Sequence, residues 1–284
     1  MKLCRYLHHN QIRVGIVGER GRLRKLSGAG VSDITSLLEK ADPVQHLRSL
    51  ASESLDEVHI SEVRVLPPIE RQEVWAVGVT YLRSKAARME ESDFSATAYD
   101  KVYDAPRPEL FFKSMPEKVV GFGDKVGIRR DAKWNVPEPE LALVLNSRGE
   151  IVGYTIGNDM SSRDIEGENL LYLPQAKIYD RSCALGPFIE IAASEEEVRA
   201  WKIEIQISRG NEVVFRGDTS IGRIKRKFRE LAEYLFRSQT FPHGAVLLTG
   251  TGVVPTDEFT LQAGDVIRID VDGIGSLENS VVIV

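Results

Sequence analysis

Nine short segments rich in apolar and β-branched residues follow one another after residue 108, and turn signals separate them at hairpin spacing. The turns include "NSRGE", "SRGNE" and "LQAGD", whose small and polar residues favour a tight reversal of the chain. Strands joined by such turns pair in antiparallel fashion. The pattern therefore predicts a mainly antiparallel β fold rather than a doubly wound parallel sheet. The segments are ELFFK, KVGIRR, EPELALVLN, IVGYTIGND, WKIEIQISRG, NEVVFRGD, AVLLTGT, DVIRIDVDG and SVVIV.

The first seventy residues are organised differently. Strand-like pieces ("KLCRYL", "IRVGIVG") alternate there with a helical pattern, "SDITSLLEKA", for which Ser32 is the expected cap. In "VLPPIERQEV", Pro67 and Pro68 cannot lie inside a central strand or helix, which indicates a linker. We predict a small N-terminal α+β domain over residues 1–68 and a larger domain over 69–284.

The predicted larger domain begins with a predicted buried strand, "EVWAVGVT", and a predicted helix in "YLRSKAARMEESD". A further helix is expected after the cap candidates Thr219 and Ser220, because apolar residues recur there from Ile221 to Leu235 at intervals of three and four. It carries the basic run "GRIKRKFR". A solvated helix face is the favoured interpretation of this run, and a phosphate or RNA patch is the alternative.

Composition and charge narrow the class of function. The chain has 284 residues, of which 42% are hydrophobic and 28% charged, as in ordinary globular enzymes. A net charge of -5 argues against a nucleic-acid surface, so small molecules are the expected partners. No apolar run approaches the roughly 20 residues that span a bilayer, and the polar start does not resemble a signal peptide. A cytoplasmic location without membrane contact is expected. Cys4 and Cys183 form no metal-binding pattern and are expected to be reduced and structural.

Two glutamates stand at the head of an apolar run in "VPEPELALVL". Side chains alternate along a strand, so Glu138 and Glu140 point to the same face. Partly buried like charges at this spacing raise each other's pKa unless a cation neutralises them. One interpretation is a cation site; the other is the solvated end of an edge strand, where both glutamates pair with Lys or Arg.

A third carboxylate favours the cation site. Asp159 ends the segment "IVGYTIGND", which follows the turn "NSRGE", and antiparallel pairing returns this end beside Glu138 and Glu140. Three carboxylates without a nearby histidine or thiolate favour Mg²⁺, Mn²⁺ or Ca²⁺ over zinc. Such an ion can chelate a 2-oxoacid and, as a Lewis acid, stabilise its enolate.

The chain resembles the fumarylacetoacetate hydrolase superfamily. The similarity rests on "PELFFKS", "PEPELALVLNSRGEIVGYTIGNDMSSRDIE", "YLPQAKIYDRSCALGP" and "LLTGTGVVP", which occur in the family's order between about Val74 and Gly264. The resemblance implies a mixed β-sandwich roll after the N-terminal unit. It also implies a homodimer or homotetramer.

The resemblance assigns roles to individual residues. It makes Glu138, Glu140 and Asp159 the metal ligands and Lys177 the lysine that approaches the substrate. Without the family pattern, Lys177 is more typical of a surface lysine. Arg163 and Asp164 are expected to brace the turn behind the metal, with Arg163 facing the substrate. Lys113 and Thr251 match positions that line the pocket, although each is equally well explained as a residue required by the fold.

One departure from the family concerns the water-activating pair. Many hydrolases of the superfamily carry G-x-N-Y-x-x-H-x-x-E, whereas this chain has "GVTYLRSKAARMEE", with Ser84 and Ala87 at the histidine and glutamate positions. None of the five histidines fills the gap. Loss of a general base costs about 10²- to 10⁴-fold in rate, which argues against hydrolysis.

A smaller branch of the superfamily lacks the same histidine and shares the patterns RPE-x-FFK, RD-x-E-x-EN and LYLPQ-x-KIY with this chain. The resemblance to this branch implies a metal-dependent dehydratase of a 2-keto-3-deoxy sugar acid that acts through a chelated enolate. It also implies that Glu109 works with Lys177 as an acid/base pair, although a salt bridge at a strand start explains Glu109 almost as well. The alternative function is a C–C hydrolase or decarboxylase acting on an acylpyruvate or another 1,3-dicarbonyl acid.

Overall fold

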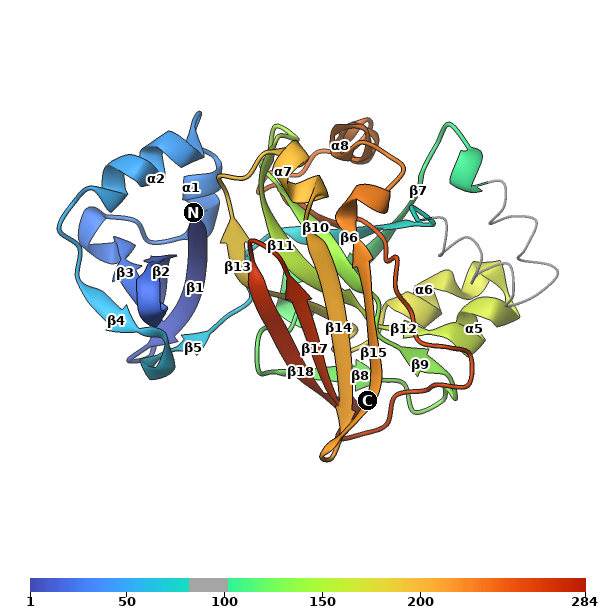
Figure 1. Cartoon of the computed structure of the whole chain (residues 1–284). Coiled ribbons are helices and arrows are strands. Elements are labelled where there is room, and N and C mark those ends of the chain that lie inside the picture. Colours follow the sequence, from blue (N-terminus) through green and yellow to red (C-terminus); the bar gives the residue numbers. More distant parts are fainter. Residues whose placement is uncertain (82–101) are drawn as a thin grey trace.

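A computed structural model describes residues 1–81 and 102–284 of the chain (Figure 1). The helix predicted in "YLRSKAARMEESD" lies outside these residues except for Tyr81. The strands are β1 (Lys2–His8), β2 (Gln11–Val17), β3 (Arg22–Lys25), β4 (Glu57–His59), β5 (Arg64–Val65), β6 (Glu73–Gly78), β7 (Glu109–Ser114), β8 (Lys125–Ile128), β9 (Asn135–Val136), β10 (Pro139–Leu145), β11 (Ile151–Asp159), β12 (Ser161–Ser162), β13 (Cys183–Glu190), β14 (Lys202–Arg209), β15 (Glu212–Ser220), β16 (Ala245–Leu248), β17 (Val266–Val271) and β18 (Gly275–Ile283). The α-helices are α1 (Ile34–Leu38), α2 (Pro43–Ala51), α5 (Arg163–Glu168), α6 (Leu173–Lys177), α7 (Glu195–Arg199) and α8 (Phe228–Phe236). Short 3₁₀ helices are η1 (Glu19–Gly21), η2 (Leu26–Ala29), η3 (Ile60–Glu62), η4 (Pro116–Lys118), η5 (Leu170–Tyr172) and η6 (Ile221–Arg223).

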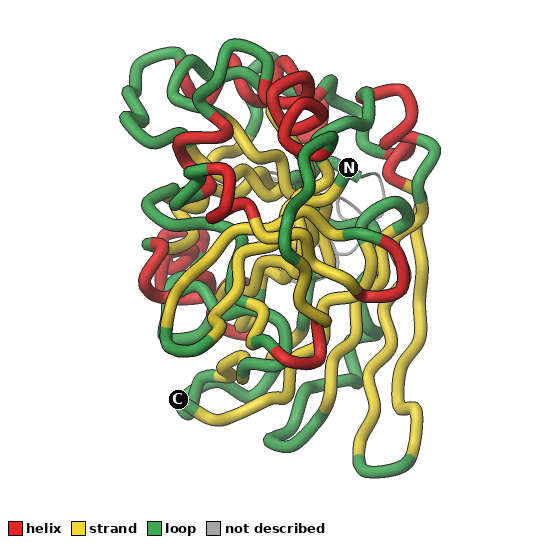
Figure 2. Tube along the Cα trace, turned by 90° about the vertical axis from the view of Figure 1, so that its left-hand side faces the viewer, coloured by secondary structure: helices red, strands yellow, loops and turns green. Residues whose placement is uncertain are grey.

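The strands form an eleven-stranded, a five-stranded and a two-stranded sheet. The large sheet runs β4-β3-β2-β1-β13-β11-β10-β16-β6-β7, with β5 beside β1, and the second sheet runs β15-β14-β17-β18-β8. Only the pairs β16–β6 and β18–β8 are parallel among the described strands. Strands run through the middle of the molecule and reach its lower edge, and the short helices lie mostly toward its top and sides (Figure 2). The predicted mixed α+β, mainly β class with largely antiparallel pairing is confirmed.

The N-terminal elements share the large sheet with the rest of the chain. Pro67 and Pro68 lie between β5 and β6, as expected of a linker. Strand β1, however, pairs with β13 through Lys2↔Glu190 and Leu3↔Ile189, so one sheet crosses the predicted boundary. The division into domains 1–68 and 69–284 stays a prediction.

The main core lies between the two larger sheets. Leu141, Leu143 and Leu145 of β10 point into it together with residues of β14, β17 and α8. Ala142 and Val144 point to the opposite face and pack in two other apolar clusters. Both faces of β10 are therefore buried, as the alternation in "ELALVL" predicts.

One predicted helix cap is wrong, and the other caps a shorter helix than expected. Helix α1 is capped by Asp33, whose carboxylate accepts a 2.7 Å hydrogen bond from the Ser36 amide, and not by Ser32. The helix expected after Thr219 and Ser220 is interrupted. Ser220 caps the 3₁₀ helix η6, where its hydroxyl accepts a 3.3 Å hydrogen bond from the Gly222 amide, and α8 begins only at Phe228. The segment between them is held by Arg199, which donates to the carbonyl oxygens of Ile224 and Arg226 at 3.0 and 2.7 Å. The apolar residues of this segment are buried without forming one helix.

The basic run therefore lies mostly before α8. Lys225 contacts the Asp104 carboxylate at 2.5 Å, and Arg226 contacts Glu230 at 2.6 Å. Arg226 also donates to the carbonyl oxygens of Ala105 and Pro106. Apart from Arg226, the basic side chains of the run are exposed, which agrees with the favoured solvated face, and Lys225 and Arg226 also bind groups of the protein itself.

Strand β13 is the central element that the sequence pattern did not predict. It contains Gly186 and Pro187, a pair that weakens a strand prediction. The pairing with β11 jumps from Ile156↔Gly186 to Tyr154↔Glu190, so the proline occupies an irregularity in the ladder. An interior strand can therefore contain a proline at this point.

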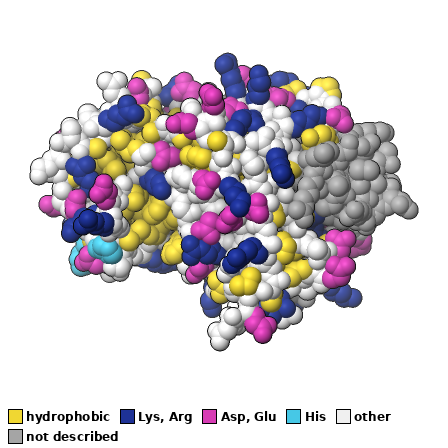
Figure 3. Space-filling model, in the orientation of Figure 1, with side chains coloured by type: hydrophobic (Ala, Val, Ile, Leu, Met, Phe, Trp, Pro, Cys, Tyr) yellow, Lys and Arg dark blue, Asp and Glu magenta, His cyan; other side chains and the backbone are white. Residues whose placement is uncertain are grey.

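On the face shown in Figure 3, acidic and basic side chains alternate, and Lys and Arg do not gather in one patch. Among the described residues, no helix is both long and apolar enough to cross a bilayer.

Candidate active site

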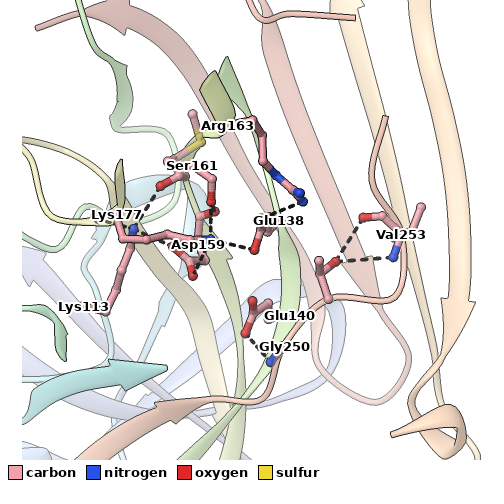
Figure 4. Close-up of polar contacts among 11 residues, drawn as sticks. Lys113, Glu138, Glu140, Asp159, Ser161, Arg163, Lys177, Gly250 and Val253 are labelled. Atoms are coloured by element: carbon pink, nitrogen blue, oxygen red, sulfur yellow. Dashed lines mark hydrogen bonds and ion pairs between the residues drawn. The ribbon is translucent and has the colours of Figure 1, made fainter. Parts of the chain in front are cut away.

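Three carboxylates converge at one end of the β10–β11 hairpin. Glu140 lies in β10 opposite Gly157, Asp159 ends β11, and the Asp159 amide donates to the Glu138 carbonyl oxygen at 3.0 Å. Glu138, Glu140 and Asp159 are 4%, 1% and 1% exposed, and one oxygen of each lies within 4.8 Å of the others (Figure 4). The structure thus brings together the three residues that the hairpin argument predicted to meet.

This trio has the donor set of a hard divalent cation. The pKa of Glu140 is raised well above its usual value. Burial is the largest cause, and the negative charges of Asp159 and Glu138 add to it. Three converging carboxylate oxygens are the ligands that Mg²⁺ prefers, and a bound cation would offset their repulsion. The residues therefore fit such an ion, as the sequence suggested.

The loop after β16 orients Glu140. The Gly250 amide donates a 2.6 Å hydrogen bond to Oε2 of Glu140 (Figure 4). Gly250 has a φ of +87°, and a Cβ atom there would overlap the Thr80 hydroxyl. Glycine is thus required at this position of the "TGT" segment. The sequence analysis selected its neighbour Thr251, which lines the pocket and donates to the Val253 carbonyl oxygen at 3.0 Å.

Lys177 points at the trio from the end of α6. Its Nζ atom lies 2.9 Å from Glu138 Oε2 and 3.4 Å from Asp159 Oδ2. It also donates to the Ser161 hydroxyl at 2.5 Å, and the Phe111 ring lies 5.8 Å away. Lys177 is only 1% exposed. The surface location considered for Lys177 is therefore wrong, and its amine is held in one direction by several partners.

Lys113 lies behind the trio rather than in the pocket lining. It is fully buried, and its Nζ atom lies 2.5 Å from Asp159 Oδ1. The same amine donates to the carbonyl oxygens of Met160, at 3.0 Å, and of Lys177. This geometry supports a role in holding Asp159, and the predicted contact with substrate stays a prediction.

Arg163 starts α5 and reaches back to the trio. Its Nη2 atom lies 2.9 Å from Glu138 Oε1, and the side chain lines the pocket at 4% exposure. Asp164 accepts a 2.6 Å hydrogen bond from the Lys133 amide. Both contacts agree with the predicted bracing of this turn.

Glu109 lines the same pocket as Lys177 and comes from β7. It begins β7 and pairs with Gly78, the last residue of β6. A Cβ atom on Gly78 would overlap the Glu109 carboxylate, so the glycine gives this side chain its room. Glu109, Lys177 and the trio all line the same pocket.

Three residues of the site were missed by sequence reasoning. Ser161 contacts Lys177, Gly250 contacts Glu140, and Glu166 of α5 lines the pocket at 2% exposure. The "ND-x-S" and "TGT" motifs contain the first two, and their spacing from the ligands was the available signal. Glu166 lies three residues after Arg163, on the same helix face.

The family model for the fumarylacetoacetate (FAA) hydrolase C-terminal domain matches residues 73–282. The chain is 42% identical to a "Probable 2-keto-3-deoxyxylonate dehydratase" of Haloferax volcanii, over 97% of this chain and 99% of that protein. It is 41% identical to a 2-dehydro-3-deoxy-D-arabinonate dehydratase of Saccharolobus solfataricus, over 78% of this chain and 76% of the relative.

A solved structure has the same fold. It is a 2-keto-3-deoxy-D-arabinonate dehydratase complexed with magnesium and 2,5-dioxopentanoate, and it superposes with a TM-score of 0.84 at 34% identity. The similarity covers 100% of this chain and 99% of the other. The protein therefore belongs to the fumarylacetoacetate hydrolase family.

Proposed function

We propose that this protein is a divalent-metal-dependent hydro-lyase that dehydrates a 2-keto-3-deoxy sugar acid such as 2-keto-3-deoxy-D-arabinonate. The observation that carries the proposal is the buried trio Glu138, Glu140 and Asp159 in one pocket with Lys177 and Glu109. Dehydratase relatives at 41% and 42% identity support the substrate class. Mg²⁺ is the proposed metal, with Mn²⁺ or Ca²⁺ as substitutes for the same oxygen ligands.

The chemistry needs no activated water. A divalent ion bound by the trio would polarise the C2 carbonyl of the substrate and so make its C3 protons more acidic. Lys177 and Glu109 form the acid/base pair that removes a C3 proton and protonates the departing C4 hydroxyl. Arg163 and Thr251 line the pocket and bind the substrate, while Lys113 supports Asp159.

For a five-carbon substrate the assigned product is 2,5-dioxopentanoate. It has the atoms of the substrate minus one water. It is also the compound bound with magnesium in the related dehydratase structure. We further propose a cytoplasmic homodimer or homotetramer without nucleic-acid or membrane partners, and the two-domain division at residue 68.

The test is a substrate screen with purified protein and Mg²⁺. Products from 2-keto-3-deoxy pentonates, 2-keto-3-deoxy hexonates and acylpyruvates are identified by NMR. The expected result is a semialdehyde from a sugar acid and no cleavage of acylpyruvates. Cleavage of an acylpyruvate into two acids, with the sugar acids untouched, would overturn the proposal in favour of a hydrolase.

A further inference from the structure

We propose that Glu166 is a third proton-transfer residue of this site, which removes a proton from C5 of the substrate after water has left. The inference rests on the proposed dehydratase function and extends it to the second half of the reaction. It assigns the conversion of the first unsaturated product into the aldehyde to the enzyme rather than to solution.

The need for such a residue follows from the positions of the hydrogens. Loss of the C3 proton and the C4 hydroxyl leaves a C3=C4 double bond conjugated with the C2 carbonyl, and C5 still carries its hydroxyl. In 2,5-dioxopentanoate, C5 is an aldehyde and C3 and C4 are both CH₂. The two molecules contain the same atoms. Elimination alone therefore does not give the assigned product.

The second half is a tautomerisation in which every proton is accounted for. The Glu166 carboxylate removes a C5 proton, and that electron pair forms C4=C5. The C3=C4 pair moves to C2=C3, and the carbonyl pair moves onto the C2 oxygen. Protonation at C3 restores the C2 carbonyl and leaves an enol at C4=C5. Loss of its hydroxyl proton and protonation at C4 then give the C5 aldehyde.

Glu166 lies where such a group is required. Helix α5 presents Arg163 and Glu166 on one face, and both side chains line the pocket with Lys177 and Glu109. Glu166 is 2% exposed, so its carboxylate faces the protein interior and the pocket rather than solvent. A few buried polar groups that converge on one pocket are the usual sign of a functional site.

The other acidic residues that line the pocket, among those the structure describes, already have proposed roles. Glu138, Glu140 and Asp159 form the group whose oxygens can share an ion, and Glu166 is not part of that group in the described part of the chain. Arg163 reaches Glu138 at 2.9 Å, and Glu166 follows Arg163 by about one turn on the same face of α5. This spacing suits a substrate whose C5 lies three bonds from the chelated C2 carbonyl.

The test compares Glu166→Gln with the matched control Glu168→Gln, which removes an exposed carboxylate from the same helix. Substrate loss, the vinyl protons of 5-hydroxy-2-oxopent-3-enoate and the aldehyde are followed together by ¹H NMR. In Glu166→Gln we expect aldehyde formation to slow by about 10²- to 10⁴-fold while the enone accumulates. Glu168→Gln is expected to match the unmodified protein.

A second experiment uses the unmodified protein and does not depend on how a variant folds. Substrates with one deuterium at C5, in either the R or the S configuration, are converted, and deuterium in the aldehyde is measured. A single base predicts retention from one isomer and loss from the other. Equal deuterium retention from both isomers would overturn the proposal. So would a Glu166→Gln variant that forms the aldehyde at the unmodified rate. A Glu166→Gln variant that no longer consumes substrate and forms no enone would overturn it as well. If the unmodified protein consumes no sugar acid, the proposed dehydratase function is wrong, and this result is distinct from a failure of the role proposed for Glu166.

Discussion

The Nζ atom of Lys177 lies 2.9 Å from Oε2 of Glu138, although thirty-nine positions separate the two residues along the chain. Glu138 immediately precedes β10, whereas Lys177 ends α6 after the chain has passed through β11, β12 and α5. The contact joins the proposed acid/base residue to the proposed metal ligands. In the proposed reaction, the proton-transfer residue thus lies directly beside the groups that would hold the metal.

Replacement of Lys177 tests its role in catalysis. Lys177→Met keeps most of the side-chain length but removes the amine, so kcat is expected to fall by about 10²- to 10⁴-fold. Steady-state kinetics with the sugar acid identified in the screen measure the change, and circular dichroism checks the fold. Lys118→Met is the control, because the Lys118 side chain is 54% exposed and pairs with Asp180 on the surface. A kcat within twofold of the unmodified protein would exclude Lys177 from the chemistry.

The trio is expected to bind Mg²⁺ as a unit. Glu140→Gln removes a ligand charge and is expected to weaken Mg²⁺ binding by about tenfold or more, since even outer contacts at metal sites contribute about 10- to 100-fold. Isothermal titration calorimetry measures the affinity, and Glu212→Gln at the exposed start of β15 is the control. Equal affinities in both variants would contradict the assignment.

Mg²⁺ is also expected to stabilise the fold. A ligand that binds only the folded state at 100 times its Kd adds about 2.7 kcal/mol to the free energy of unfolding. The thermal midpoint should rise with Mg²⁺ and fall back after chelation with EDTA, together with turnover. A midpoint independent of Mg²⁺ at millimolar concentration would mean that the trio holds no such ion.

Gly78 is expected to control Glu109 without affecting the metal site. In Gly78→Ala the new methyl group occupies the space of the Glu109 carboxylate, so the carboxylate must move. We expect kcat to fall to the level of Glu109→Ala while Mg²⁺ affinity is unchanged. Gly28→Ala is the matched control, because a Cβ atom there meets nothing within 4 Å. Full activity in Gly78→Ala would mean that the position of Glu109 is not critical.

Local pattern was enough to predict the core of the site. Alternation along a strand placed Glu138 and Glu140 on one face, and a hairpin returned Asp159 beside them. These relations depend only on strand period and on a short turn. The structure agrees with them in the register of β10 and β11.

Features that depend on distant parts of the chain were not predictable in this way. Strand β13 contains Pro187, and only the irregular pairing with β11 shows why a proline is tolerated there. Helix α8 starts only at Phe228, and the carbonyl oxygens of Ile224 and Arg226 before it bind Arg199, which comes from outside the segment. The apolar residues that recur every three or four positions in this region are indeed buried, but part of the segment is irregular and not helical.

Both cysteines are expected to be unreactive in the folded protein. Burial raises the pKa of Cys4 and the pKa of Cys183 from 9.0 to about 12. An unfolded thiol loses its proton above about pH 9, whereas the folded one keeps it until about pH 12. The unfolded state then binds fewer protons, so these groups lower the free energy of unfolding as pH rises from 9 towards 12. The measurement is thiol labelling at pH 8.5. In the folded protein the reagent should react only as fast as the chain unfolds. In guanidinium it should react with both thiols immediately. Cys4→Ala, with one remaining thiol, calibrates the signal; immediate reaction of a thiol in the native protein would contradict the burial of that residue.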